Sequence, residues 1–300
     1  MADHAPDASV AAAEQARAGA AREWWSSLGR RTATAFALIP VVVALVWFGG
    51  WVAFAGATLT LLLALFELRA MLAQRGWHLV FLLSLAFGVD FLLAAMLPQQ
   101  RAALLQIGIT ATLAGAFTWL ILTRRATLEN SLTDWALTLA LPVYLGWPLS
   151  LFLAMRGAVA GYKPAGFWWV LTTLFCVWAF DTFALLGGRV WGRTKLAPWI
   201  SPKKTWEGAA VGLVFALIAG FVFTRPLGIA WYHGLAIGAV VSVAATIGDL
   251  AESLLKRDTG VKDSGSIVPG HGGILDRTDS LLFGAMAVFF YGVALGAFSL

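Results

Sequence analysis

Long apolar runs separated by short polar segments cover most of this chain, and they restrict its possible folds more than any other feature. We place the runs at about 35–49, 51–66, 77–97, 102–122, 135–155, 167–186, 208–224, 229–250 and 280–298. An α-helix needs about 20 predominantly apolar residues to cross the hydrocarbon core of a bilayer. The sequence therefore predicts an all-α, polytopic integral membrane protein with about nine transmembrane helices.

The amino-acid composition excludes an ordinary soluble protein. Hydrophobic residues make up 60% of the chain and charged residues only 12%, whereas soluble globular chains carry roughly 25% charged residues. A chain with so little charge cannot cover a water-exposed surface. The single cysteine, Cys176, excludes an internal disulfide framework and a cysteine-based zinc site. Its apolar neighbours predict a small, buried side chain.

The basic residues indicate how the chain is oriented in the membrane. If the N-terminus is cytoplasmic, 17 of the 21 Lys and Arg residues fall in cytoplasmic segments, and the four exceptions are Arg101, Arg156, Lys163 and Arg225. Cytoplasmic segments of membrane proteins are enriched in Lys and Arg. We therefore expect a multi-pass protein of the cytoplasmic membrane. We attribute its net charge of +5 to this orientation and expect no nucleic-acid partner.

The same topology divides the chain into regions. Residues 1–34 are polar and lack the apolar stretch of a secretory signal, so we expect a cytoplasmic N-terminal extension before a membrane-embedded domain at 35–300. Two cytoplasmic segments of this domain, 187–208 and 250–280, carry dense charges of both signs. The positive-inside rule explains their basic residues but not the six acidic residues in or beside the second segment: Asp249, Glu252, Asp258, Asp263, Asp276 and Asp279.

Spacing suggests how the first of these acids are arranged. Glu252, Ser253 and Lys256 follow Asp249 at i+3, i+4 and i+7. Residues at these spacings share one face of an α-helix. If the helix continues beyond the apolar run, all four side chains face the same way, either as a solvated helix end or as part of a site.

A second pair of carboxylates suggests a metal site. Asp276 and Asp279 lie at i and i+3 where the last apolar run begins, where the helix dipole alone would favour acids. Mg²⁺ prefers carboxylate oxygens and usually takes one or two of them together with substrate phosphates. We therefore predict that Asp249 and Asp276 bind Mg²⁺, with clustered Lys and Arg holding a polyphosphate.

Other polar positions give weaker signals. Five glycines between residues 260 and 273 allow backbone N–H groups to approach an anion. His271 has no histidine partner nearby, so we expect a phosphate or loop contact rather than zinc binding. Asp181 lies inside an apolar run, where an ionisable group usually faces a polar cavity. Asp90 is also surrounded by apolar residues, and we expect a structural or dimer-contact role for it.

Three segments near the C-terminus closely resemble the signature of phosphatidate cytidylyltransferases, the CDP-diacylglycerol synthases. They are SLLKR at 253–257, KDSG at 262–265 and PGHGGILDRTD at 269–279. Val268 departs mildly from this pattern, which usually has Leu, Ile or Phe there. Asp181 and the segment from Gly187 to Gly208, which includes SPKKTWEG, also resemble the family.

The resemblance implies that the protein transfers a cytidylyl group from CTP to phosphatidic acid, giving CDP-diacylglycerol and pyrophosphate. It also implies Mg²⁺ dependence, with the metal held by Asp249 and Asp276, and a homodimer. Phosphatidic acid stays in the leaflet and CTP in the cytosol, so we expect the site at the cytoplasmic interface of the bilayer.

Roles for the remaining polar residues follow from this chemistry. We expect Lys256, Arg257, Lys262 and Arg277 to bind phosphates and Asp263 to hold a second cation or orient a lysine. We expect Arg189, Lys203 and Lys204 to bind the lipid headgroup or close over CTP, and Ser201 and Thr205 to donate hydrogen bonds. The other expected substrate-binding residues are Asp181, Glu207, Ser253, His271, Gly272, Gly273 and Asp279.

Two other functions remain open from the sequence. A transporter would use the intramembrane acids Asp90 and Asp181, although no inverted repeat is visible and the charges concentrate in the cytoplasmic segments. A CTP-dependent lipid kinase would need similar phosphate-binding groups. The kinase releases CDP, whereas a cytidylyltransferase releases pyrophosphate.

Overall fold

The computed structural model describes residues 39–123, 128–157, 164–265 and 272–298. Within these ranges the chain forms nine α-helices, one for each predicted apolar run. They are a short helix at Ile39–Phe48, α2 (Gly50–Ala73), α3 (Phe81–Met96), α4 (Arg101–Thr123), α5 (Ser131–Arg156), α6 (Pro164–Trp191), α7 (Trp206–Phe223), α8 (Trp231–Asp258) and α9 (Leu275–Ala294). Short 3₁₀ turns, η1 (Pro98–Gln100) and η2 (Arg225–Leu227), precede α4 and follow α7.

The structure confirms an all-α membrane protein, with one small addition. Between α6 and α7, the strands β1 (Lys195–Ala197) and β2 (Ser201–Thr205) form an antiparallel hairpin. Among the described helices, six are long and apolar enough to span a bilayer, namely α2, α4, α5, α6, α7 and α8. The helix at Ile39–Phe48 and α3 are apolar but shorter, and the first two turns of α9 contain charged residues. The number of predicted spans thus exceeds the number that length and composition support.

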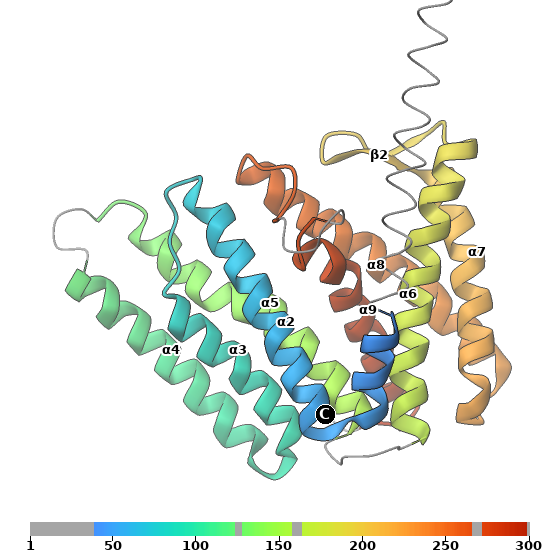
Figure 1. Ribbon diagram of the computed structural model, residues 1–300, viewed down its shortest axis with the longest axis horizontal. Coiled ribbons are helices and arrows are strands. Elements are labelled where there is room, and N and C mark those ends of the chain that lie inside the picture. Colours follow the sequence, from blue (N-terminus) through green and yellow to red (C-terminus); the bar gives the residue numbers. More distant parts are fainter. Residues whose placement is uncertain (1–38, 124–127, 158–163, 266–271, 299–300) are drawn as a thin grey trace, which may run out of the picture.

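The helices lie side by side in two groups, with α9 between them (Figure 1). One core is formed mainly by α6, α7 and α8, and the other mainly by α2, α3 and α5. α9 contributes Ala285, Val288 and Phe289 to the first core and Leu275 and Leu282 to the second. This central position places the N-terminus of α9 next to both α8 and α2. Cys176 is fully buried in the first core, as predicted.

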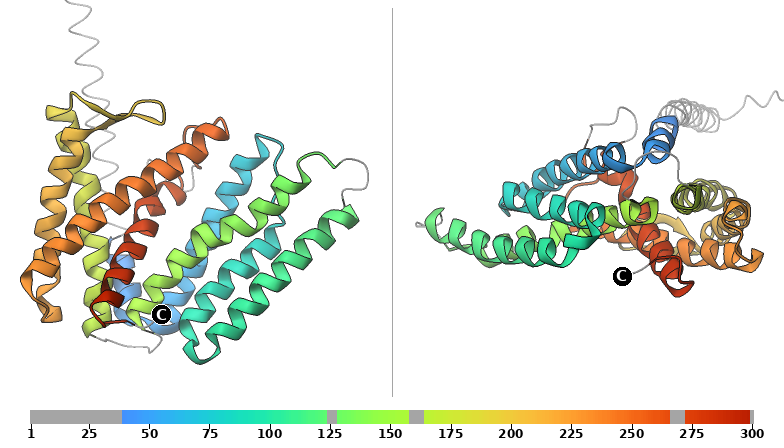
Figure 2. Two further views of the ribbon diagram at one scale, coloured as in Figure 1. Left: turned by 180° about the vertical axis from the view of Figure 1, so that it is seen from behind. Right: turned by 90° about the horizontal axis from the view of Figure 1, so that it is seen from below.

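Alternating helix directions bring the polar segments to one end of the bundle. The α2–α3 connection, the hairpin and the facing ends of α8 and α9 lie at the upper end in Figure 1, and the view from behind in Figure 2 shows the same arrangement. The α3–α4 and α7–α8 turns lie at the opposite end. The segments that carry most of the predicted site therefore share one end of the molecule.

The helices extend further into the polar segments than the sequence indicates. α6 continues to Trp191 and α7 begins at Trp206, so the first connection is shorter than the predicted 187–208. α8 continues to Asp258 and α9 begins at Leu275, so much of 250–280 is helical rather than loop. Good helix formers and an i,i+4 ion pair support α8 beyond its apolar part.

Candidate active site

The C-terminal part of α8 presents a polar face, as the spacing predicts. Ser253 Oγ donates a hydrogen bond to Asp249 Oδ1 at 3.3 Å. One turn further on, Lys256 Nζ lies 2.7 Å from Glu252 Oε2, although the Glu252 side chain is only 1% exposed. A buried carboxylate is costly without a charged partner. The lysine therefore makes this burial possible.

The first turn of α9 completes this cluster. Lys256 Nζ also lies 2.7 Å from Asp276 Oδ1, so it bridges α8 and α9. The other oxygen, Asp276 Oδ2, accepts hydrogen bonds from Ser264 Oγ at 2.9 Å and Gly273 N at 2.7 Å. Asp276 lies ahead of the apolar part of α9. Burial raises the pKa of Asp276. Hydrogen bonds, first with Glu252 and then with Lys256, outweigh this effect and hold the pKa at about 2. Asp276 is therefore a fixed anion at neutral pH.

A second cluster lies deeper along α8. Lys204 Nζ, from β2, is 2.7 Å from Asp249 Oδ2, and both side chains are partly exposed. Asp181 of α6 and Asp279 of α9 lie close enough to Asp249 to interact with it electrostatically. Ser280 Oγ donates to Asp181 Oδ1 at 3.4 Å. Asp181 thus lies among polar groups from three other elements. Such surroundings are expected, because an ionisable side chain is costly to place in the apolar part of a membrane.

The hairpin is held in place over the end of α8. Glu207, in the first turn of α7, accepts hydrogen bonds from the backbone N–H groups of Arg193 (3.1 Å) and Thr194 (3.0 Å). Arg257 Nε donates to Ile200 O at 3.3 Å. Successive side chains of a strand point to opposite faces. On β2 this directs Lys204 toward Asp249 and leaves its neighbour Lys203 exposed.

Some expected substrate contacts have a structural role here. Thr205 is buried, and its Oγ1 accepts the Gly208 N–H as the N-cap of α7. Such a cap typically stabilises a helix by about 1 kcal/mol. Glu207 binds backbone amides, as described above. Gly273 packs against side chains where a Cβ would collide, and Gly272 has a positive φ of 81°.

Other predicted residues lie on the elements that surround these clusters. The side chains of Arg189, Lys203, Lys262, Asp263 and Arg277 are exposed, and Ser201 is partly exposed on β2. His271 lies outside the described residues. Asp90 lies against Gly108 of α4, which agrees with a structural contact rather than a place in the site.

Glu67 is a residue that the sequence analysis missed. Its side chain is only 4% exposed, and it reaches from α2 to the N-terminus of α9. Glu67 accepts hydrogen bonds from Ile274 N at 2.8 Å and Leu275 N at 2.9 Å, and Ser264 Oγ lies 3.2 Å away. The sequence does contain an indication of this role, because Glu67 lies near the end of the apolar run TLLLALFELR. A carboxylate that is buried in such a run needs hydrogen-bond partners.

The carboxylates of the two clusters have the chemistry of ligands for a hard cation. No set of three His, Cys, Asp or Glu side chains forms a ready-made metal site among the residues that the structure describes. Asp249 and Asp276 lie in adjoining clusters, each with its own lysine. Mg²⁺ commonly takes one or two carboxylates and completes its coordination with phosphates and water. The carboxylate oxygens of Asp249 and Asp276 are ligands of this kind, and each now faces a lysine ammonium group.

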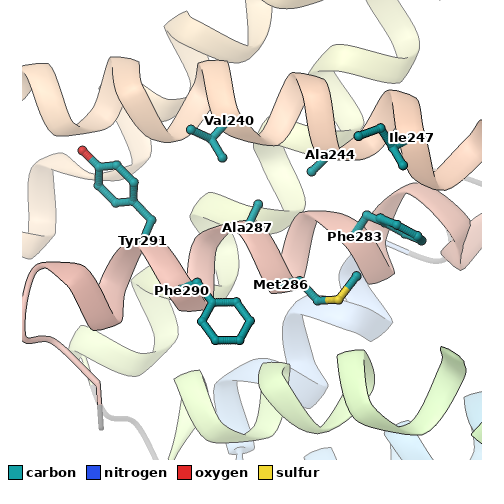
Figure 3. A pocket seen from close by; sticks show the side chains of 8 residues that line it. All are labelled: Val240, Ala244, Ile247, Phe283, Met286, Ala287, Phe290 and Tyr291. Carbon is teal, nitrogen blue, oxygen red and sulfur yellow. The ribbon is translucent and has the colours of Figure 1, made fainter. Parts of the chain in front are cut away.

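An apolar groove of about 530 Å³ lies between α8 and α9, apart from this site (Figure 3). Val240, Ala244 and Ile247 line it from α8, and Phe283 and Ala287 are among its residues on α9. At 100° per residue, the groove residues of α8 lie on the side opposite Asp249. The groove therefore belongs to the apolar exterior of the bundle.

Comparison with known proteins agrees with the geometry. The profile of the "Cytidylyltransferase family" matches residues 29–295. A phosphatidate cytidylyltransferase of Brucella abortus is 34% identical over 277 residues, which cover 89% of this chain and 94% of that protein. One from Synechocystis is 41% identical over 162 residues, covering 51% of this chain and 53% of the relative.

A third relative matches over a shorter stretch. The chloroplastic phosphatidate cytidylyltransferase 4 of Arabidopsis thaliana is 50% identical over 122 residues, which are 39% of this chain and 30% of that protein. The chain thus spans less than two thirds of some relatives and nearly all of others. The profile match and the Brucella alignment both extend over most of the sequence, and the chain belongs to the cytidylyltransferase family.

Proposed function

We propose that this protein transfers a cytidylyl group from CTP to phosphatidic acid, forming CDP-diacylglycerol and pyrophosphate for phospholipid synthesis. The observation that carries the proposal is the pair of lysine–carboxylate clusters where α8, α9 and the hairpin meet. Such clusters suit two substrates that both carry phosphate groups. The relatives named phosphatidate cytidylyltransferase support the same reaction.

The lysines provide positions for the phosphates. Lys204 and Lys256 each lie 2.7 Å from a carboxylate, and each can exchange that contact for a phosphate oxygen. The phosphate of phosphatidic acid has a second pKa near ~6, like other phosphomonoesters, so its oxygen needs little help from a general base. This oxygen attacks the α-phosphorus of CTP, and the bond to pyrophosphate breaks. Catalysis then rests on positioning and charge neutralisation.

We propose Asp249 and Asp276 as the residues that hold Mg²⁺. When bound, Mg²⁺ would neutralise charge on the phosphates. Two further assignments stay predictions. They are a second cation near Asp263 and phosphate contacts by Arg257, Lys262 and Arg277. So does the homodimer that the family resemblance implies.

The proposal includes an orientation in the membrane. We infer that all nine helices lie in the membrane and that the N-terminus and the site face the cytoplasm. The described basic residues support this, because they concentrate at the hairpin end, while Arg101, Arg156 and Arg225 lie at the opposite end.

Cysteine labelling tests this orientation. The native Cys176 is buried and should give little background. We expect an impermeant maleimide to label Ala230→Cys, at the opposite end, in intact cells. Trp199→Cys, in the hairpin turn where the side chain is 79% exposed, should be labelled only after permeabilisation. The reverse pattern would contradict the orientation.

Pyrophosphate release tests the reaction itself. We expect the purified full chain in detergent to release pyrophosphate from CTP only when phosphatidic acid and Mg²⁺ are both present. The lipid product should be CDP-diacylglycerol. Release of CDP instead would identify a lipid kinase, and no reaction by demonstrably folded protein would favour the transporter.

A further inference from the structure

Glu67 contacts the α8–α9 connection, residues 259–274, at two places. At the first place, Ser264 Oγ lies 3.2 Å from Glu67 Oε2. At the second place, Ile274 N and Leu275 N donate to the two oxygens of Glu67. The chain between these places carries the signature segment PGHGG. One carboxylate from α2 therefore contacts the connection at Ser264 and again where it enters α9.

The packing around Glu67 shows how closely the connection surrounds its carboxylate. A Cβ on Gly265 would come within 2.8 Å of Glu67 Oε1. A Cβ on Gly273 would collide with Glu67 Oε2 and with Ser264 Oγ. Because only glycine leaves room at these two positions, the backbone at both places can approach the same carboxylate.

Glu67 is also linked to Asp276 through a shared hydroxyl group. Ser264 Oγ lies 3.2 Å from Glu67 Oε2 and 2.9 Å from Asp276 Oδ2. A serine hydroxyl has one proton to donate. The two carboxylates therefore compete for the same hydrogen bond, and a change at Glu67 alters the environment of Asp276.

We propose that Glu67 is a positioning residue for the nucleotide site: it holds Ser264 beside the N-terminus of α9 and fixes Asp276 in its reactive orientation. This inference rests on the proposed function. Glu67 lies on α2, outside the segments that resemble the family signature, and the described structure places its carboxylate against backbone and Ser264 rather than in the lysine clusters. It acts through the connection and not through substrate contact.

Glu67→Gln tests this role with minimal change in shape. The amide keeps one acceptor oxygen but presents an NH₂ group to a backbone N–H, so one of the two α9 hydrogen bonds is lost. We expect kcat/KM for CTP to fall about 10- to 100-fold, as for other residues that orient ligands indirectly. The KM for phosphatidic acid should stay within about twofold, since distant groups act independently. Glu129→Gln, an exposed site at the same end of the bundle, is the matched control and should behave as wild type.

A double-mutant cycle separates positioning from a general loss of stability. Glu67→Gln and Ser264→Ala interrupt the same network, so their effects on kcat/KM for CTP should be clearly non-additive. Additive effects on kcat/KM for CTP would overturn the inference. So would a fall in kcat/KM that is equal for both substrates and proportional to the fraction of unfolded protein. Wild-type protein that releases no pyrophosphate would instead refute the proposed function, so the two failures are distinguishable.

Discussion

Replacing Asp276 with asparagine is expected to lower the rate of pyrophosphate release by about 10²- to 10³-fold, as for other groups that stabilise charge in a transition state. Asparagine has nearly the shape of aspartate but no negative charge. Its NH₂ group also faces either Lys256 or the donors Ser264 and Gly273, which now contact Asp276. Because Lys256 keeps Glu252 as its partner, we expect the variant to fold. The loss of rate should then reflect the missing negative charge at position 276.

The experiment measures initial rates at saturating CTP and phosphatidic acid over a series of Mg²⁺ concentrations. Asp258→Asn provides the control, because Asp258 is exposed and its ion pair with Arg75 is long, at 3.9 Å. We expect that variant to keep nearly full activity. Wild-type Mg²⁺ dependence in Asp276→Asn would remove Asp276 from the proposed metal ligands while leaving the enzymatic reaction intact.

Replacing Lys256 with methionine is expected to affect both stability and activity. Its ammonium group lies 2.7 Å from Glu252 and from Asp276, and its side chain is 12% exposed. Without it, the buried acid Glu252 and the Asp276 carboxylate lose the cation that lies between them. Removal of one partner from a buried ion pair typically costs about 3–5 kcal/mol. We therefore expect a clear fall in the melting temperature and a loss of activity of more than about 10²-fold.

A second substitution separates these two effects. Glu252→Gln in the Lys256→Met background replaces the buried acid that has lost its cation with a neutral amide, so the melting temperature should largely recover. Activity should not recover, because the phosphate-binding ammonium group is still absent. Lys195→Met, at an exposed position of β1, controls for the loss of one positive charge and should leave the melting temperature unchanged. If restored stability also restores activity, Lys256 is structural and does not bind phosphate.

The sequence by itself determined the features that depend on local periodicity. Apolar runs predicted where the described helices lie, because a helix must satisfy its own backbone in a membrane. The i, i+3, i+4 and i+7 spacing predicted the polar face of α8, which the Ser253–Asp249 and Lys256–Glu252 contacts confirm. Helix ends were less well predicted, because charged helix-forming residues carry α8 beyond the apolar run.

Only the tertiary structure decided which groups meet across elements. The pairing of Lys204 with Asp249 depends on a hairpin that sequence periodicity did not reveal, and the bridge from Lys256 to Asp276 depends on how α8 and α9 pack. Glu67 lies about 200 residues from its partners in the chain. Sequence spacing carries information over a few helical turns, whereas such a contact is fixed by the central position of α9 between two cores. The reaction was implied by the resemblance of continuous segments to a known family, whereas the role of Glu67 depends on contacts between distant segments that only the fold brings together.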